Sequence, residues 1–137
     1  MREPDVAAVA AQAGARSAEI ERARTLPADL VEDLAATGVF RLWVPADLGG
    51  VEADVATGLG VIEDIAYHDG STGWCVMIAM TTGLLGAFLL EEHARAIYGA
   101  AGAVTGGFAA PVGRATTLDG GGPVSYTHLT LPTNREV

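Results

Sequence analysis

The side chains that could do chemistry are few and scattered along this chain of 137 residues. His68 follows Asp64 by four positions, a spacing that puts both on one face of a helix, where they could pair in solvent. His93 lies among charged residues, and we expect it to be solvated in the same way. Neither histidine has the further ligands that a metal site needs, so the sequence predicts no metal.

Cys75 is the only cysteine, which excludes an internal disulfide and a cysteine-based metal cluster. It lies in an apolar stretch with nothing nearby to lower its pKa, so we expect a small buried hydrophobic residue rather than a nucleophile. A single cysteine is compatible with a reducing cytoplasm, the compartment that we expect. No Gly-x-Gly-x-x-Gly or P-loop pattern is present, so neither type of nucleotide site is expected.

The net charge of −9 and the absence of lysine argue against some classes of partner. Nucleic acids and anionic membrane surfaces are bound by basic patches, whereas the arginines here are scattered. We therefore expect neither partner. Half of the residues are hydrophobic, which is enough for a core and argues against wholesale disorder.

The first hundred residues predict helices. The first helix is expected from about residue 5 to residue 24, and the second from Pro27 to about Thr37, where Gly38 provides a left-handed stop. Residues 39–44 alternate in character before Pro45, which favours a short extended run. A third helix is expected from residue 54 or 57 to residue 67, and a short amphipathic helix over residues 91–98.

A fourth helix is predicted after Ser71, whose hydroxyl is a suitable N-cap. The stretch from Gly70 to Leu90 has no charged residue, and a membrane span needs about 20 mostly apolar residues. Threonines and glycines interrupt the stretch, and its flanks carry acidic residues without a nearby Lys or Arg to orient it. A buried central helix is the favoured interpretation, and a membrane span is the alternative.

After residue 100 the pattern changes to strands. Residues 104–111 and 114–118 are expected to be extended, and residues 119–122 form a hairpin turn whose return strand is expected to be missing. Residues 124–133 can be encoded by the transposase adapter of a common sequencing-library chemistry, and Ala and Gly disappear after Pro123. We interpret residues 123–137 as a non-native, adapter-derived tail. A natural polar tail is the alternative.

Two blocks resemble a known family: residues 38–50, a helix stop followed by a proline and a double glycine, and residues 69–74, Asp-Gly-Ser-Thr-Gly-Trp. Their order and spacing resemble the N-terminal helical domain of the acyl-CoA dehydrogenase superfamily. The resemblance implies a mainly α fold, with a helical domain over residues 1–100 and the first strands of a truncated β-domain over residues 101–122. It also implies a flavin, FAD or FMN, a homo-oligomer when intact, and a catalytic base beyond this chain, so no catalytic residue is named.

The resemblance assigns the flavin contacts to the entry of the β-domain, namely Phe108, Ala109, Ala110, Pro111 and Gly113. Acyl-CoA dehydrogenases typically carry Thr-Glu-Pro there, and this chain has Ala-Ala-Pro. That departure resembles the flavin-dependent hydroxylase branch, which takes reduced flavin from a separate reductase. Without the family, this stretch is only the end of a strand.

The same resemblance places Trp74 and Thr82 at a substrate pocket. Thr82 stands about where hydroxylases tend to have a histidine, so that residue's role does not transfer. Trp74, like Trp43, could instead be a core aromatic residue.

We therefore expect part of a flavin-dependent oxidoreductase, inactive by itself, with a monooxygenase of the hydroxylase branch favoured. The first alternative is an FAD-dependent dehydrogenase that acts on acyl thioesters and passes electrons to a transfer partner. The second is a helical interaction module without enzymatic activity.

Overall fold

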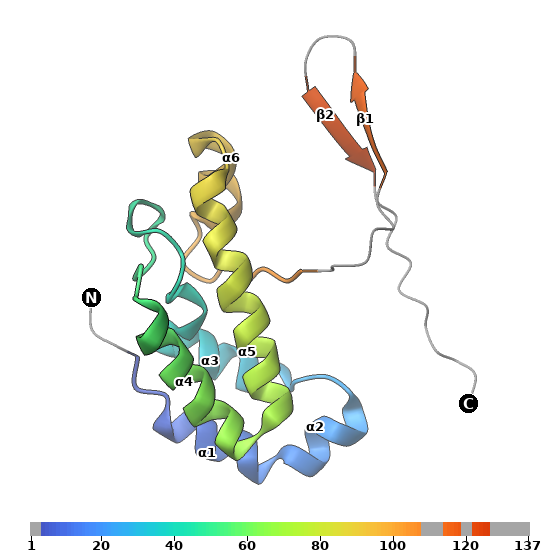
Figure 1. Cartoon of the computed structure of the whole chain (residues 1–137). Helices are drawn as coiled ribbons and strands as arrows, with labels where there is room; N and C mark the ends of the chain where they lie inside the picture. Colours follow the sequence, from blue (N-terminus) through green and yellow to red (C-terminus); the bar gives the residue numbers. More distant parts are fainter. Residues whose placement is uncertain (1–3, 108–113, 119–121, 127–137) are drawn as a thin grey trace, which may run out of the picture. The chain divides into compact units, whose positions relative to one another are not determined.

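The computed structural model describes residues 4–107, 114–118 and 122–126. The chain divides into two compact units, Met1–Gly107 and Phe108–Val137, and each is described by itself. The first unit is helical, as the sequence predicts (Figure 1). Its α-helices are α1 (Ala7–Ala15), α2 (Ser17–Ala23), α3 (Ala28–Thr37), α4 (Val55–His68), α5 (Gly70–Gly83) and α6 (Glu91–Tyr98). Short 3₁₀ turns join them: η1 (Val39–Arg41), η2 (Ala46–Leu48) and η3 (Leu84–Phe88).

The second unit contains an antiparallel pair of strands, β1 (Arg114–Leu118) and β2 (Gly122–Tyr126). Arg114 lies opposite Tyr126, and Leu118 lies opposite Gly122. The expectation that the return strand is missing is wrong, because Gly122 and the first four residues assigned to the tail form it. The strand predicted over residues 104–111 does not form in its described part, residues 104–107. Two adjacent glycines there weaken any preference for a strand.

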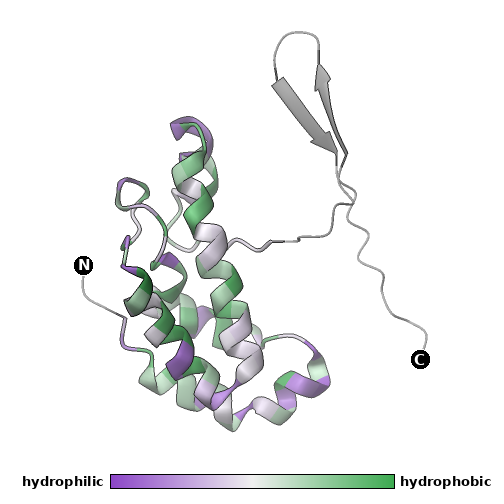
Figure 2. Ribbon diagram, in the orientation of Figure 1, coloured by the Kyte–Doolittle hydropathy of each residue, from purple (hydrophilic) through white to green (hydrophobic). Residues whose placement is uncertain are grey.

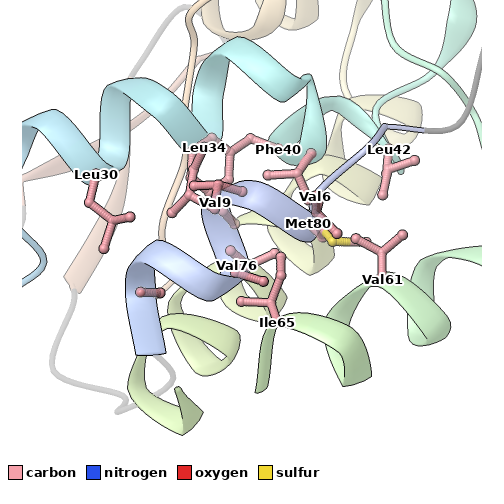
Figure 3. Packing of buried hydrophobic residues seen from close by; sticks show 14 of the residues in the cluster. Val6, Val9, Leu30, Leu34, Phe40, Leu42, Val61, Ile65, Val76 and Met80 are labelled. Carbon is pink, nitrogen blue, oxygen red and sulfur yellow. The ribbon is translucent and has the colours of Figure 1, made fainter. Parts of the chain in front are cut away.

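The core of the helical unit lies where α4 and α5 pack along each other and α1 packs against α4 (Figure 1). Figure 3 shows apolar side chains from these helices, from α3 and from η1 meeting in one cluster. Its members include Val9, Leu30, Leu34, Phe40, Ile65, Val76 and Met80. Small residues allow the close approach of α4 and α5, since a Cβ on Gly73 would lie 2.5 Å from Cβ of Ala66.

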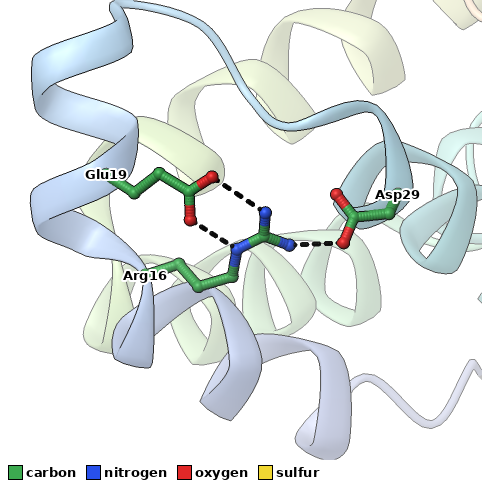
Figure 4. Close-up of polar contacts among 3 residues, drawn as sticks. All are labelled: Arg16, Glu19 and Asp29. Atoms are coloured by element: carbon green, nitrogen blue, oxygen red, sulfur yellow. Dashed lines mark hydrogen bonds and ion pairs between the residues drawn. The ribbon is translucent and has the colours of Figure 1, made fainter.

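The single helix predicted over residues 5–24 is in fact two helices that meet at Arg16, whose φ of −108° and ψ of 8° depart from helical values. The Arg16 guanidinium donates to Glu19 at 2.9 and 3.0 Å and to Asp29, at the start of α3, at 2.7 Å (Figure 4). These bonds lower the pKa of both carboxyl groups. The break turns α2 away from the axis of α1, and tertiary bonds of this kind are not visible in a local periodicity.

The extended run predicted over residues 39–44 is also wrong. Gly38 does end α3 with a φ of 83°, but the chain then turns into η1 and all six residues are buried. A strand with one face in solvent would bury only every second side chain of this segment. The compact turn buries the side chains at both the odd and the even positions. A later part of the chain holds this segment in place: the Val51 amide donates to the Arg41 carbonyl at 2.9 Å, and the Ala53 amide donates to the Leu42 carbonyl at 2.8 Å.

Candidate functional site

The Asp-Gly-Ser-Thr-Gly-Trp corner is held together by Asp69, the N-cap of α5. Its Oδ1 accepts from the Thr72 amide and the Thr72 hydroxyl, both at 2.7 Å, and its Oδ2 accepts from the Ser17 hydroxyl at 2.8 Å. The predicted cap, Ser71, is exposed and does not cap the helix. Asp69 also connects the start of α5 to the start of α2, so the corner is fixed by contacts far apart in sequence.

The residue Asp69 is only 8% exposed, yet its carboxyl group remains favoured in the ionised form. Burial is the largest single influence and raises its pKa, but the hydrogen bonds from Thr72 and Ser17 together outweigh burial and lower the pKa overall. The corner is therefore anchored by a charged group whose two oxygens both accept hydrogen bonds within the fold.

Helix α5 is coloured apolar to neutral along most of its length (Figure 2), and its two faces have nearly equal hydropathy. The buried face, which includes Val76, Ala79 and Met80, packs on α4 and η1. The opposite face of α5 and η3 is exposed and carries large apolar side chains: Trp74, Leu84, Leu85 and Phe88. We call this set the exposed α5 face.

By length and composition, Gly70–Phe88 is apolar enough to cross a membrane, and 39% of that stretch is buried within the fold. The contacts of its buried face support the interpretation as a core helix rather than a span. A helix that is apolar all round is also what a larger protein buries on both sides.

Trp74 lies at one end of the exposed α5 face, beside a hollow of about 560 Å³. The hollow is formed by the start of α5 together with the end of α2 and the residues after it: Ile20, Glu21, Arg24, Thr25, Leu26, Gly70, Ser71, Trp74 and Cys75. Trp74 is 64% exposed, so the core alternative is wrong for this residue, whereas Trp43 is buried.

Cys75 is exposed, and the prediction of a buried cysteine is wrong. The helix turns Val76 inward and leaves Cys75 at the hollow beside Trp74. Desolvation by neighbouring atoms and the charge of Asp69 raise the pKa of the thiol, so the neutral form is favoured. That agrees with the expectation that Cys75 is not a nucleophile.

Thr82 does not line the hollow beside Trp74. It lies eight residues further along the helix, about 12 Å away at 1.5 Å per residue. Its hydroxyl lies 3.0 Å from the carbonyl oxygen and 2.9 Å from the hydroxyl oxygen of Thr105. The two residues predicted for a substrate pocket are therefore separate, and whether either contacts substrate stays a prediction.

Arg41 is a buried residue that the sequence analysis did not single out. Its guanidinium donates to the carbonyl oxygens of Tyr98 at 2.7 Å and Ala100 at 3.2 Å, and also to that of Leu48. The first two carbonyls lie at the C-terminal end of α6, where the helix dipole favours a cation. The only signal in the sequence was one arginine inside an apolar run.

The remaining candidates give no site in the described part of the chain. His68 and His93 are exposed, and Nε2 of His93 lies 3.7 Å from a carboxylate oxygen of Glu92. Among the described residues, no three His, Cys, Asp or Glu side chains gather as metal ligands would. The predicted flavin contacts, Phe108, Ala109, Ala110, Pro111 and Gly113, lie outside the described residues.

Comparison with known families identifies the helical unit. Residues 4–96 match the model of the acyl-CoA dehydrogenase N-terminal domain. The chain belongs to the acyl-CoA dehydrogenase family. The match covers the corner at Asp69, both faces of α5 and most of α6, so the resemblance noted from two short blocks extends over most of the helical unit.

Several curated relatives of this acyl-CoA dehydrogenase-type domain are monooxygenases. The indole-3-acetate monooxygenase of Pseudomonas putida is 39% identical over 85 residues, which are 62% of this chain and 22% of that protein. The oxygenase subunit HsaA of a flavin-dependent monooxygenase from Rhodococcus jostii (strain RHA1) is 41% identical over 59 residues, 43% of this chain and 15% of that protein. A dibenzothiophene monooxygenase of Rhodococcus erythropolis is 39% identical over 66 residues, 45% and 16% of the two chains. The chain thus spans less than a quarter of the length of these relatives.

Proposed function

We propose that this chain is the N-terminal helical part of a flavin-dependent monooxygenase that acts on an aromatic substrate. The observation that carries the proposal is that relatives similar to part of this chain are monooxygenases named for indole-3-acetate and dibenzothiophene. The sequence supports the same branch, because Ala109 and Ala110 replace the Thr-Glu pair typical of acyl-CoA dehydrogenases.

The proposed role of the helical domain is to contribute one wall of the substrate pocket. The exposed α5 face is uncharged and carries a tryptophan, and an indole ring can stack on an aromatic substrate at a centroid distance of about 4.5–7 Å. Trp74 is therefore the residue that we propose for substrate contact.

The cofactor of the intact protein is proposed to be a flavin, FAD or FMN, held in part by residues 108–113. When bound, reduced flavin supplies the two electrons that reduce one oxygen atom of dioxygen to water while the other enters the substrate. HsaA is named as an oxygenase subunit, which supports a separate reductase as the source of reduced flavin. We further propose that the intact protein is a cytoplasmic homo-oligomer and that the present chain is inactive.

The second candidate is an FAD-dependent acyl-CoA dehydrogenase. The name of the matched family favours it, since dehydrogenases share this N-terminal domain. Such an enzyme would use a carboxylate to remove the proton α to the thioester, and that carboxylate is not assigned in this chain.

The two candidates are separated by the intact gene product, purified and tested with two substrate sets. One reaction contains reduced flavin, dioxygen and either indole-3-acetate or dibenzothiophene, and product is followed by chromatography. The other contains the oxidised holoenzyme and acyl-CoAs of several lengths, and loss of the flavin absorbance is followed. We expect hydroxylated or oxygenated product from the first reaction and no bleaching in the second. Bleaching by an acyl-CoA without any oxygenated product would reject the proposal in favour of the dehydrogenase.

A further inference from the structure

The exit segment, Ala101–Gly107, joins the helical unit to the residues that the proposed function assigns to flavin. It contains no helix or strand, and within the described part of the chain one backbone hydrogen bond holds it, from Ala103 N–H to Ala100 O at 3.0 Å. Regular structure therefore does not fix its course. Side chains must do so.

Thr82 supplies the main contact. Its hydroxyl oxygen lies 3.0 Å from the Thr105 carbonyl oxygen and 2.9 Å from the Thr105 hydroxyl oxygen. It is also within 2.9 and 3.0 Å of the carbonyls of Ile78 and Ala79 in its own helix. A hydroxyl has one proton and two acceptor lone pairs. If the Thr105 hydroxyl donates to Thr82, the Thr82 proton is free for the Thr105 carbonyl, and two bonds join the same two residues.

The surroundings of Thr82 reinforce this contact. The Tyr98 hydroxyl donates to the Thr82 carbonyl at 2.7 Å, and Arg41 donates to the Tyr98 and Ala100 carbonyls. A Cβ on Gly107 would lie 3.1 Å from Cγ2 of Thr82, which is tighter than ordinary packing. The end of α5, the end of α6, Ala100 just before the exit segment and Thr105 within it are thus connected through Thr82, Tyr98 and Arg41.

We infer that Thr82 is a positioning residue, which fastens the exit segment to α5 and so fixes the point at which the chain leaves the helical unit. The fastening follows from the contacts alone. Its consequence for flavin rests on the proposed function. This role replaces substrate contact as the function of Thr82.

The neighbouring Thr81 gives a matched control. Its hydroxyl donates only within its own helix, to the carbonyls of Met77 or Ile78 at 2.9 and 3.0 Å. Thr81→Val and Thr82→Val remove the same group from adjacent positions, and only the second removes a bond to the exit segment. Thr82→Ser keeps the hydroxyl and serves as the conservative rescue.

The test is to measure backbone ¹⁵N order parameters of residues 103–107 in the 137-residue chain at low protein concentration. We expect values near 0.85 in the unmodified chain, in Thr81→Val and in Thr82→Ser, and values below about 0.6 in Thr82→Val. Thr105→Val removes only the hydroxyl–hydroxyl bond, because the Thr105 backbone carbonyl can still accept from Thr82, and it should lower the order parameters less than Thr82→Val does. Equal order parameters in Thr81→Val and Thr82→Val would overturn the inference.

A second measurement uses the intact protein and separates the fastening from the proposed function. Thr82→Val should weaken flavin binding about fivefold, the factor that corresponds to the loss of one ordinary hydrogen bond, while KM for the aromatic substrate stays unchanged. A rise in KM with unchanged flavin affinity would overturn the inference and return Thr82 to the substrate pocket. If the intact protein binds no flavin, the proposed function fails, and the order parameters alone decide the fastening.

Discussion

Replacing Asp69 with alanine is the sharpest test of how the corner before α5 is held. The change removes the acceptor for the Thr72 amide, the Thr72 hydroxyl and the Ser17 hydroxyl. Loss of an N-cap costs about 1 kcal/mol. A hydrogen bond to a charged group contributes about 1.5–3 kcal/mol, and the Ser17 bond adds one that a simple cap does not have. We expect Asp69→Ala to lower the free energy of unfolding by about 3 kcal/mol.

Urea unfolding followed by circular dichroism measures this change. At a slope of about 1.5 kcal/mol per molar urea, the midpoint should fall by about 2 M. Asp69→Asn keeps one carbonyl acceptor for the Thr72 amide, so we expect about half the loss.

Asp54 provides a matched control for this variant. It caps α4 through the same pattern, accepting from the Thr57 amide at 2.9 Å and the Thr57 hydroxyl at 2.8 Å. It is exposed, however, and no third side-chain partner is found among the described residues. We expect Asp54→Ala to be clearly milder than Asp69→Ala. Equal losses from the two variants would refute the reasoning, because burial and the Ser17 bond would then contribute nothing.

Four further outcomes are expected, each by the same unfolding assay unless another is named. The pKa of Asp69 is lower in the folded state than in the unfolded state, so its ionised carboxylate stabilises the fold above the unfolded-state pKa, and this stabilisation is lost as the pH falls through the folded-state pKa. The free energy of unfolding should therefore drop below about pH 4, and it should drop less steeply in Asp69→Ala. Gly73→Ala should destabilise by about 1–3 kcal/mol, since the new Cβ would lie 2.5 Å from that of Ala66; no loss would show that α4 and α5 can separate freely. Arg41→Met should lose about 3 kcal/mol by leaving buried carbonyls unpaired, and Arg41→Lys should recover only part of it. Phe88→Ser should reduce self-association in sedimentation velocity, because Phe88 is 83% exposed on an apolar face; an unchanged distribution would mean that this face does not drive association.

The sequence predicted the helices whose ends carry their own signals. Pro27 and Gly38 bracket α3, Asp54 was one of two expected starts for α4, and residues 91–98 form α6 as expected. At α3 and α4 the signal is local, because a cap or a stop acts on the adjacent turn. Helix α6 has no side-chain cap at its start and no left-handed stop at Gly99, so its amphipathic pattern predicted it. The family assignment was also reachable from sequence, since it depended on two short blocks.

The errors share a physical cause, which is that long-range contacts decided the outcome. The break at Arg16 depends on Asp29, and the choice of Asp69 over Ser71 as the cap depends on Ser17. The exposure of Trp74 was not predictable, because α5 is apolar on both faces and its periodicity does not indicate which face is buried. The role of Thr82 depends on a partner that lies 23 residues away in the sequence.

The central claim, monooxygenation by the intact protein, is tested most directly by the fate of labelled oxygen. The intact protein is supplied with reduced flavin, indole-3-acetate and ¹⁸O₂, and the mass of the reaction product is measured by mass spectrometry. A monooxygenase should give a product that carries a single ¹⁸O atom, with the second atom of dioxygen in water. Product without ¹⁸O, or no product at all from any aromatic substrate together with reduction of bound flavin by an acyl-CoA, would contradict the account.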